Sequence, residues 1–131
     1  MPHSLSLRVY YEDTDLAGIV YYANYLKFIE RGRSEWVRAL GVDQAALRRD
    51  EGIVFAVRHL QADYLRPAVF DDWLTVTTSV LPPKGARIVL DQAVLRDGAV
   101  LFAARVTLVP MGPDGRVVRL PAGLRQRLSQ G

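Results

Sequence analysis

The apolar positions in the first third of the chain predict a strand, a turn and a long helix. Residues 5–11 alternate between apolar and polar side chains, as a half-buried strand does. Beyond a polar turn, apolar or small residues recur at spacings of three and four, as on one side of a helix: Tyr22, Tyr25, Ile29, Gly32, Trp36 and Leu40. Gly41 follows directly, where a C-terminal helix cap is expected.

The rest of the chain predicts mainly strands. Four segments have strand character: residues 53–65, 73–81, 88–95 and 100–109. Gly98 lies in a predicted hairpin turn between the last two, and short helices are expected within 42–51 and 121–128. One long helix among antiparallel strands is an α+β arrangement, in which a sheet wraps around a single central helix. We expect residues 1–131 to form a single domain.

The composition excludes several classes of function. Lys and Arg outnumber Asp and Glu by only 17 to 14, so the net charge of +3 does not predict a nucleic-acid partner. The absence of cysteine excludes disulfides, a thiol nucleophile and thiolate metal ligands. No apolar run reaches the length of a transmembrane segment, and residues 1–8 lack the apolar core of a signal peptide. We therefore expect a cytoplasmic protein.

The candidate chemistry lies in the turn that joins the first strand to the long helix. Glu12, Asp13 and Asp15 bring three carboxylates into this turn, and Gly18 follows them. An aspartate before a helix is most often an N-cap, which is the structural interpretation of Asp15. Asp13 is expected to be tied into the turn by backbone N–H groups. The alternative is that one of these carboxylates acts on a substrate at the start of the helix.

The same stretch carries a motif with fixed spacing. It runs through Tyr11-Glu12-Asp13-Thr14-Asp15, Gly18-Ile19-Val20-Tyr21, Asn24-Tyr25 and residues 30–35. This pattern resembles the hotdog-fold thioesterases of the 4-hydroxybenzoyl-CoA thioesterase family, and among them the Tol-Pal-associated acyl-CoA thioesterases. The resemblance continues more weakly over nearly the whole chain, through residues 64–68 and 71–72.

The resemblance implies a hotdog fold and the hydrolysis of acyl-CoA thioesters to a free acid and coenzyme A. In the family, the aspartate that matches Asp15 either attacks the thioester carbonyl or activates a water molecule, and both roles stay open here. The backbone N–H at the position of Tyr22 polarises that carbonyl. Gly18, Ile19 and Val20 are expected to contact the substrate. The resemblance implies no cofactor and no metal ion.

The resemblance also implies partners and a further part of the substrate site. The family dimerises with active sites between protomers, so we expect a homodimer or a homotetramer; acyl carrier protein is a second expected thioester donor. Lys84 and Arg87 stand where the family places basic residues that hold coenzyme A phosphates, although a solvated hairpin end explains them equally well. Tol-Pal-associated members commonly carry histidine where this chain has Tyr22, whereas the hydroxybenzoyl enzymes have tyrosine. Proton transfer by that histidine is therefore not expected, and the acyl preference, aliphatic or aromatic, stays open.

Two other classes of function remain as alternatives. A metal-dependent phosphatase can use an Asp-x-Asp motif such as Asp13 and Asp15, but it requires alternating strands and helices and further motifs that this chain lacks. The second alternative is a non-catalytic hotdog module that binds acyl carriers or a membrane-associated complex. Release of thiol from acyl thioesters distinguishes the enzyme from this module.

Overall fold

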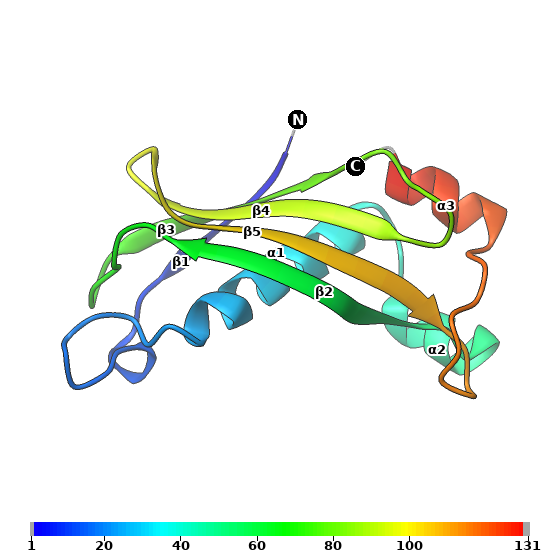
Figure 1. The fold of residues 1–131 in the computed structure, drawn as a ribbon, viewed down its shortest axis with the longest axis horizontal. Coiled ribbons are helices and arrows are strands. Elements are labelled where there is room, and N and C mark those ends of the chain that lie inside the picture. The colour runs from blue at the N-terminus through cyan, green and yellow to red at the C-terminus, as the bar shows by residue number, and fades with distance from the viewer. Residues whose placement is uncertain (1, 130–131) are drawn as a thin grey trace.

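The structure, a computed structural model, describes residues 2–129 and contains five strands, three α-helices and one short 3-10 helix (Figure 1). In chain order these elements are β1 (His3–Arg8), η1 (Tyr11–Asp13), α1 (Asn24–Ala39), α2 (Gln44–Glu51), β2 (Val54–Tyr64), β3 (Trp73–Val80), β4 (Ile88–Arg96), β5 (Ala99–Met111) and α3 (Ala122–Ser129). The predicted α+β arrangement of one long helix and antiparallel strands is confirmed.

The five strands form one antiparallel sheet in the order β1-β3-β4-β5-β2. Strands β3, β4 and β5 are consecutive neighbours, whereas β1 and β2 form the two edges of the sheet. β2 pairs with β5 from Val54 opposite Met111 to Tyr64 opposite Phe102, with one register shift between Val57 and His59. The sheet thereby places the end of β2 beside the start of β5, next to the beginning of α1 (Figure 1).

Helix α1 packs across one face of the sheet (Figure 1). It buries one side against the sheet, through Tyr25, Phe28, Ile29, Gly32, Trp36 and Val37. A Cβ atom at Gly32 would lie only 2.6 Å from Cγ1 of Val76, so the glycine allows the helix to approach β3 closely. The buried Gln92 side chain then donates hydrogen bonds to the Ile29 carbonyl (2.8 Å) and to the Thr78 hydroxyl (2.9 Å). This polar contact fixes the helix along the sheet.

Two predicted boundaries are wrong. The first strand, expected over residues 5–11, ends at Arg8, because the chain turns into η1 and the Tyr10 N–H donates to Asp13 Oδ2 at 2.8 Å. The apolar stripe of the long helix does not include Tyr22. Helix α1 begins at Asn24, and Tyr22 precedes it with 61% of its surface exposed. The predicted C-terminal glycine is confirmed, since Gly41 has a φ of +82° just after the helix.

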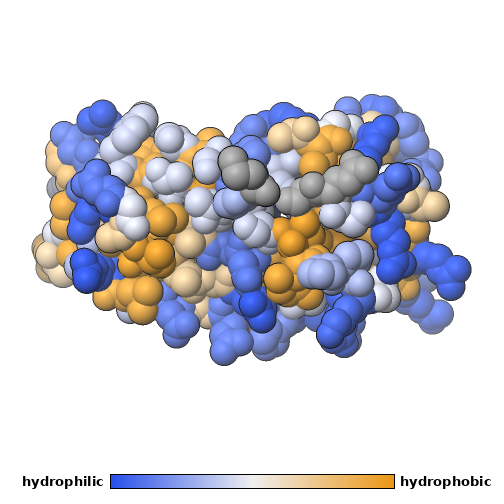
Figure 2. Space-filling view, turned by 90° about the horizontal axis from the view of Figure 1, so that it is seen from above, coloured by the Kyte–Doolittle hydropathy of each residue, from blue (hydrophilic) through white to orange (hydrophobic). Residues whose placement is uncertain are grey.

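The two ends of the molecule differ in character. One end carries the turn of residues 14–21 and the segment before β3, while α2, α3 and the loop between β3 and β4 lie at the other end (Figure 1). Figure 2 shows hydrophobic side chains gathered in two groups toward the left and centre of the face in view, and a mainly hydrophilic right-hand end.

Within residues 2–129, no helix has the length and apolar character needed to cross a membrane.

Candidate active site

Asp15 lies in a tight turn that its own backbone and side chain close. Its N–H donates to the Ile19 carbonyl at 2.9 Å, and its carbonyl accepts from Gly18 N–H at 3.0 Å. Its Oδ1 atom accepts the Ala17 N–H at 2.9 Å. Gly18 has a φ of +81°, a conformation in which a side chain would be strained. The second carboxylate oxygen, Oδ2, has no hydrogen-bond donor among residues 2–129, so it is available to a substrate or a water molecule.

Asp13 holds this turn against the start of the helix. Its carbonyl accepts hydrogen bonds from the Tyr21 N–H (2.9 Å) and from Asn24 Nδ2 (2.8 Å), while its carboxylate accepts the Tyr10 N–H. The prediction that backbone N–H groups tie Asp13 into the turn is thereby confirmed. Asn24 makes the local hydrogen bond expected of a structural residue, and Glu12 is exposed.

The segment before β3 supports the turn from the other side. The Val20 N–H donates to the Ala68 carbonyl, and the Ala68 N–H donates to the Tyr25 hydroxyl, each at 2.9 Å. Asp72 in turn accepts the Val69 N–H at 2.8 Å and forms an ion pair with Arg96, whose side chain is 33% exposed. Sequence reasoning did not assign a role to Arg96, because the pair joins two segments that are 24 residues apart.

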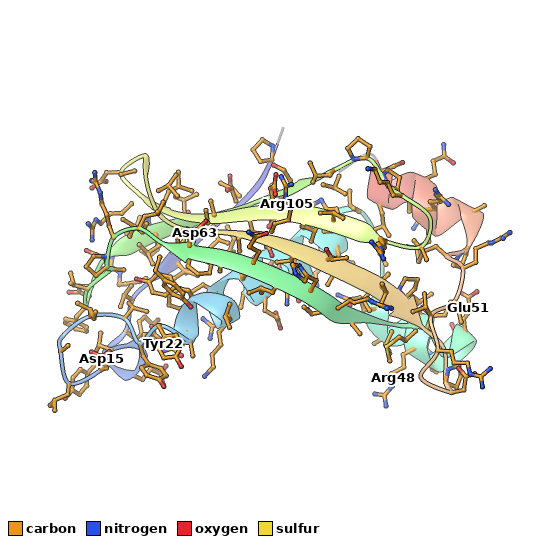
Figure 3. The ribbon with its side chains drawn as sticks, in the orientation of Figure 1. Asp15, Tyr22, Arg48, Glu51, Asp63 and Arg105 are labelled. Carbon is orange, nitrogen blue, oxygen red and sulfur yellow. The ribbon has the colours of Figure 1, made fainter. Side chains whose placement is uncertain are left out.

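A pocket of about 440 Å³ opens between this turn, the start of α1 and the end of β2. Its lining contains Asp15, four tyrosines and a mostly apolar remainder: Tyr21, Tyr22, Tyr25, Tyr64, Ile19, Val20, Leu65, Arg66 and Pro67. Figure 3 shows Asp15 and Tyr22 near each other at one end of the molecule, with Arg48 and Glu51 on α2 at the opposite end. The structure therefore brings the two predicted catalytic positions together.

The backbone just before α1 contains N–H groups that have no acceptor among residues 2–129, and one of them belongs to Tyr22, which lines the pocket. Tyr21 accepts the Asn24 N–H at 2.8 Å, and Ala23, the N-cap residue, makes no side-chain capping bond. Within the described chain, the N–H groups of Tyr22 and Ala23 donate to no acceptor. The first N–H groups of a helix carry a partial positive charge, so they attract a developing oxyanion. A carboxylate and unpaired N–H donors at one pocket form an arrangement that can attack a carbonyl carbon and stabilise the resulting negative charge.

The tyrosine wall of the pocket contains a contact that sequence reasoning missed. The Tyr64 hydroxyl donates to the Tyr22 carbonyl at 2.9 Å, although the two residues are 42 positions apart. Burial raises the pKa of Tyr64 above that of an ordinary tyrosine, and it also raises the pKa of Tyr25. Both hydroxyl groups therefore keep their protons at neutral pH. Residues 64–68 belong to the motif, but the motif alone does not indicate this contact.

The other predicted substrate-binding residues divide into two groups. Ile19 and Val20 line the pocket, and Gly18 belongs to the adjoining turn. Lys84 and Arg87 lie in the loop between β3 and β4, at the end of the sheet opposite the pocket. Both of these basic residues are exposed. Within one chain, the structure does not bring them together with Asp15.

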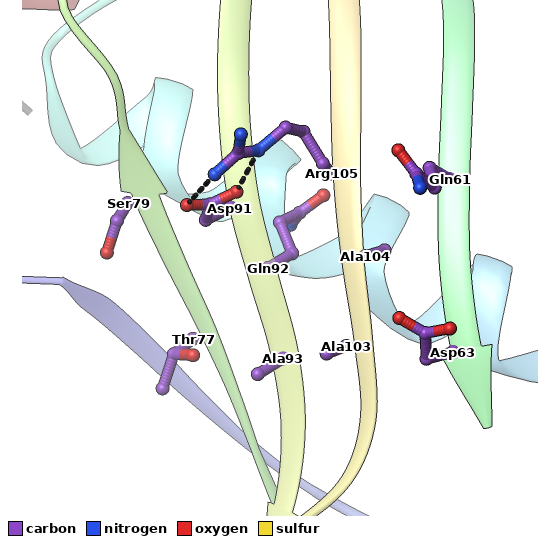
Figure 4. A pocket seen from close by; sticks show the side chains of 10 residues that line it. All are labelled: Gln61, Asp63, Thr77, Ser79, Asp91, Gln92, Ala93, Ala103, Ala104 and Arg105. Atoms are coloured by element: carbon purple, nitrogen blue, oxygen red, sulfur yellow. Dashed lines mark hydrogen bonds and ion pairs between the residues drawn. The ribbon is translucent and has the colours of Figure 1, made fainter. Parts of the chain in front are cut away.

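A second hollow, of about 380 Å³, lies on the outer face of the sheet (Figure 4). Within it, Arg105 on β5 donates two hydrogen bonds to Asp91 on the neighbouring β4, at 2.8 and 3.0 Å, and these bonds raise the pKa of Arg105. Ala93 and Ala103 form neighbouring parts of its floor. Among residues 2–129, no group of three or more His, Asp or Glu side chains is arranged to hold a metal ion, either here or at the Asp15 turn.

An antiparallel sheet packed against one long helix is the arrangement of a hotdog-fold protein. The sequence pattern of the thioesterase-like superfamily matches residues 9–128, and the chain belongs to this superfamily. It is 44% identical over 103 residues to the acyl-CoA thioesterase YbgC of Haemophilus influenzae. The aligned region covers 79% of this chain and 76% of that protein.

Solved structures show the same fold. A probable thioesterase from Bartonella henselae has a TM-score of 0.88 and 38% identity, covering 92% of this chain and 100% of its own. A variant of 4-hydroxybenzoyl-CoA thioesterase, solved in complex with 4-hydroxybenzoyl-CoA, has a TM-score of 0.91 at 22% identity, covering 98% of this chain and 99% of its own. The predicted hotdog fold and the predicted family are confirmed.

Proposed function

We propose that this protein hydrolyses acyl-CoA thioesters to a free acid and coenzyme A. The observation that carries this proposal is that Asp15 and Tyr22 line the same pocket, with no partner among residues 2–129 for Asp15 Oδ2 or for the Tyr22 N–H. A thioester needs both a nucleophile or base and a donor for its carbonyl oxygen. The similarity to proteins named as acyl-CoA thioesterases supports this substrate class.

Two routes use the same groups. As a general base, Asp15 takes a proton from water while the water oxygen attacks the thioester carbon. As a nucleophile, its carboxylate attacks the carbon itself and forms an anhydride that water then opens. In both routes the C–S bond breaks, the acyl group leaves as a carboxylic acid, and the sulfur takes up a proton as the thiol of coenzyme A. The Tyr22 N–H stabilises the negative charge on the carbonyl oxygen.

The acyl group is proposed to lie against Ile19, Val20 and the tyrosine wall, with Gly18 allowing the thioester to approach the backbone. The free edge of β2 supports a homodimer, since an unpaired edge strand readily pairs with a second copy. A two-fold axis makes the paired β2 strands antiparallel, so the end of one copy that carries Lys84 and Arg87 lies toward the pocket of the other. We propose that these residues bind the phosphates of coenzyme A in the site of the other copy.

Thiol release is the direct test of the enzyme. Aliphatic and aromatic acyl-CoAs, together with thioesters of acyl carrier protein, are incubated with the purified protein and the free thiol is measured. We expect turnover of acyl-CoAs in this assay. We also propose that the protein acts in the cytoplasm, where these substrates occur. Binding of the thioesters without thiol release would contradict the enzyme and support a non-catalytic carrier-binding module.

The oligomeric state is tested separately. Sedimentation of the protein at the concentration used for kinetics is expected to show a dimer or a larger assembly. A sedimenting monomer with full activity would contradict a site that needs a second copy. The substitution Lys84→Ala together with Arg87→Ala is expected to raise KM for acyl-CoA more than it lowers kcat, because the phosphates lie far from the bond that breaks.

A further inference from the structure

The carbonyl of Tyr22 has an unusual partner for a residue at the start of a helix. In a regular α-helix this oxygen would accept the N–H of Leu26, four residues further on. Here the Leu26 N–H donates to the Ala23 carbonyl at 3.2 Å instead. The Tyr22 oxygen accepts the Tyr64 hydroxyl at 2.9 Å. Tyr22 precedes the N-cap residue Ala23, so its carbonyl lies outside the hydrogen-bond pattern of the helix, and the Tyr64 side chain supplies its donor.

Tyr64 is attached to the sheet and to two neighbouring rings, although 48% of its own surface is exposed. It is the last residue of β2, and its backbone lies opposite Phe102 in the sheet. Its ring packs against Phe102 with the centroids 4.9 Å apart, and against Tyr25 with the centroids 5.6 Å apart. Both of these neighbours are buried. The hydroxyl thus extends from the sheet and its core to the turn that precedes the helix.

Fixing the Tyr22 carbonyl also fixes the direction of the Tyr22 N–H. The peptide group that contains this N–H is held through the Tyr21 carbonyl, which accepts the Asn24 N–H at 2.8 Å. The next peptide group is held through the Tyr22 carbonyl by Tyr64. Each peptide group is planar, so only two dihedral angles of Tyr22 relate the two groups. With both groups held, the backbone of Tyr22 has little freedom to turn.

We propose that Tyr64 is a positioning residue, whose hydroxyl orients the Tyr22 backbone so that its N–H faces the oxyanion of the reacting thioester. This inference rests on the proposed thioester hydrolysis. A positioned donor stabilises the transition state more than the bound substrate, because the charge on the oxygen develops during the attack. Removal of the Tyr64 hydroxyl should therefore lower kcat and leave KM nearly unchanged.

The substitution Tyr64→Phe tests this role, because it keeps the ring and its packing and removes only the hydroxyl. We expect kcat to fall by about 3- to 10-fold, the effect of one lost hydrogen bond, with KM changed by less than about twofold. Tyr11→Phe is the matched control. It removes an exposed hydroxyl beside the same turn. The Tyr11 ring contacts Phe70, and Tyr11 does not line the pocket. A structural role alone would lower the melting temperature of Tyr64→Phe without separating kcat from KM.

A second readout does not depend on turnover. In NMR spectra of the ligand-free protein, Tyr64→Phe is expected to shift the Tyr22 carbonyl carbon and the Tyr22 and Ala23 amide resonances, while Tyr11→Phe leaves them in place. Unchanged resonances in Tyr64→Phe would overturn the inference whether or not the protein is active. Shifted resonances with an unchanged kcat would overturn it as well. Absence of thiol release by the wild-type protein would overturn the proposed function, and with it the catalytic role of Tyr64, even where the resonances shift.

Discussion

The pocket at the start of α1 and the hollow on the outer face of the sheet have similar volumes, about 440 and 380 Å³, but their polar groups are paired differently. In the pocket, one oxygen of Asp15 and the N–H of Tyr22 have no partner within the described residues. In the hollow, Asp91 and Arg105 satisfy each other through two hydrogen bonds (Figure 4). The first site is prepared for a reacting carbonyl. In the second, the charges of Asp91 and Arg105 neutralise each other, and the exposed Asp63 carboxylate lies beside them with no partner among residues 2–129.

The difference arises from the secondary structure beneath each site. The hollow lies on the middle of a regular sheet, where neighbouring strands satisfy the backbone groups and place side chains opposite one another. The pocket lies where a helix begins, and the first N–H groups of a helix have no acceptor within it. A carboxylate turn that leads into a helix start therefore supplies unpaired N–H donors that a hollow of similar size on a sheet does not.

The largest expected effect comes from removing the unpaired donor. Tyr22→Pro eliminates the N–H, and no hydrogen bond within residues 2–129 is lost, because that N–H has no acceptor there. We expect kcat to fall by about 10²- to 10³-fold, as for other oxyanion donors, with a smaller change in KM. Steady-state kinetics and thermal unfolding are measured on the same preparations.

Tyr22→Phe is the control for this substitution, since it removes only the phenol hydroxyl and should keep most of the activity. A folded but inactive Tyr22→Phe protein would show that the phenol takes part in the reaction and that the backbone assignment is wrong. A folded and active Tyr22→Pro protein would place the donor elsewhere. Tyr22→Ala reports the contribution of packing, which acts on the melting temperature.

The ion pair beside the pocket should matter more than the pair in the hollow. Asp72→Ala removes the partner of Arg96 and the acceptor of the Val69 N–H, and the Asp72 side chain is only 17% exposed. The free energy of unfolding is expected to fall by about 1–3 kcal/mol, measured by urea denaturation. Since the same segment supports Val20 through Ala68, kcat/KM should fall as well. Unchanged stability would show that the pair does not hold this segment.

The smallest effect is expected from the exposed pair in the hollow. Asp91→Ala removes the partner of Arg105, and both side chains are substantially exposed to water, which weakens such a pair. We expect wild-type kcat/KM and a melting temperature within about 2 °C of the wild-type value. A loss of activity as large as that of Asp72→Ala would remove the distinction between the two regions.

The local features of the fold could be predicted from the sequence because they depend on neighbouring residues. The spacing from Tyr25 to Leu40 predicts α1, and the motif predicts that Asp15 and the Tyr22 backbone belong to one site. The predicted start of the helix is wrong. Tyr22 continues the apolar spacing, but it precedes the helix and its carbonyl accepts a hydrogen bond from the Tyr64 hydroxyl. Spacing alone does not reveal such a competing partner.

The remaining parts of the site depend on contacts between distant segments. Tyr64 and Arg96 reach the site through the strand order, in which β2 lies beside β5 and β4 beside β3. No local pattern of apolar residues encodes this order. Lys84 and Arg87 are a further example. The resemblance to the family predicted a substrate contact for them, but it did not indicate that they lie at the end of the sheet opposite the pocket of the same chain.

The kinetics of Asp15→Asn test the central claim most directly. Asparagine keeps the shape of the side chain and its Oδ1 acceptor for the Ala17 N–H, and it removes the charge that a nucleophile or general base requires. The account predicts that thiol release from the best acyl-CoA substrate falls by at least about 10²-fold in kcat, while the melting temperature stays near that of the wild type. A folded Asp15→Asn protein that releases thiol at close to the wild-type rate would contradict it.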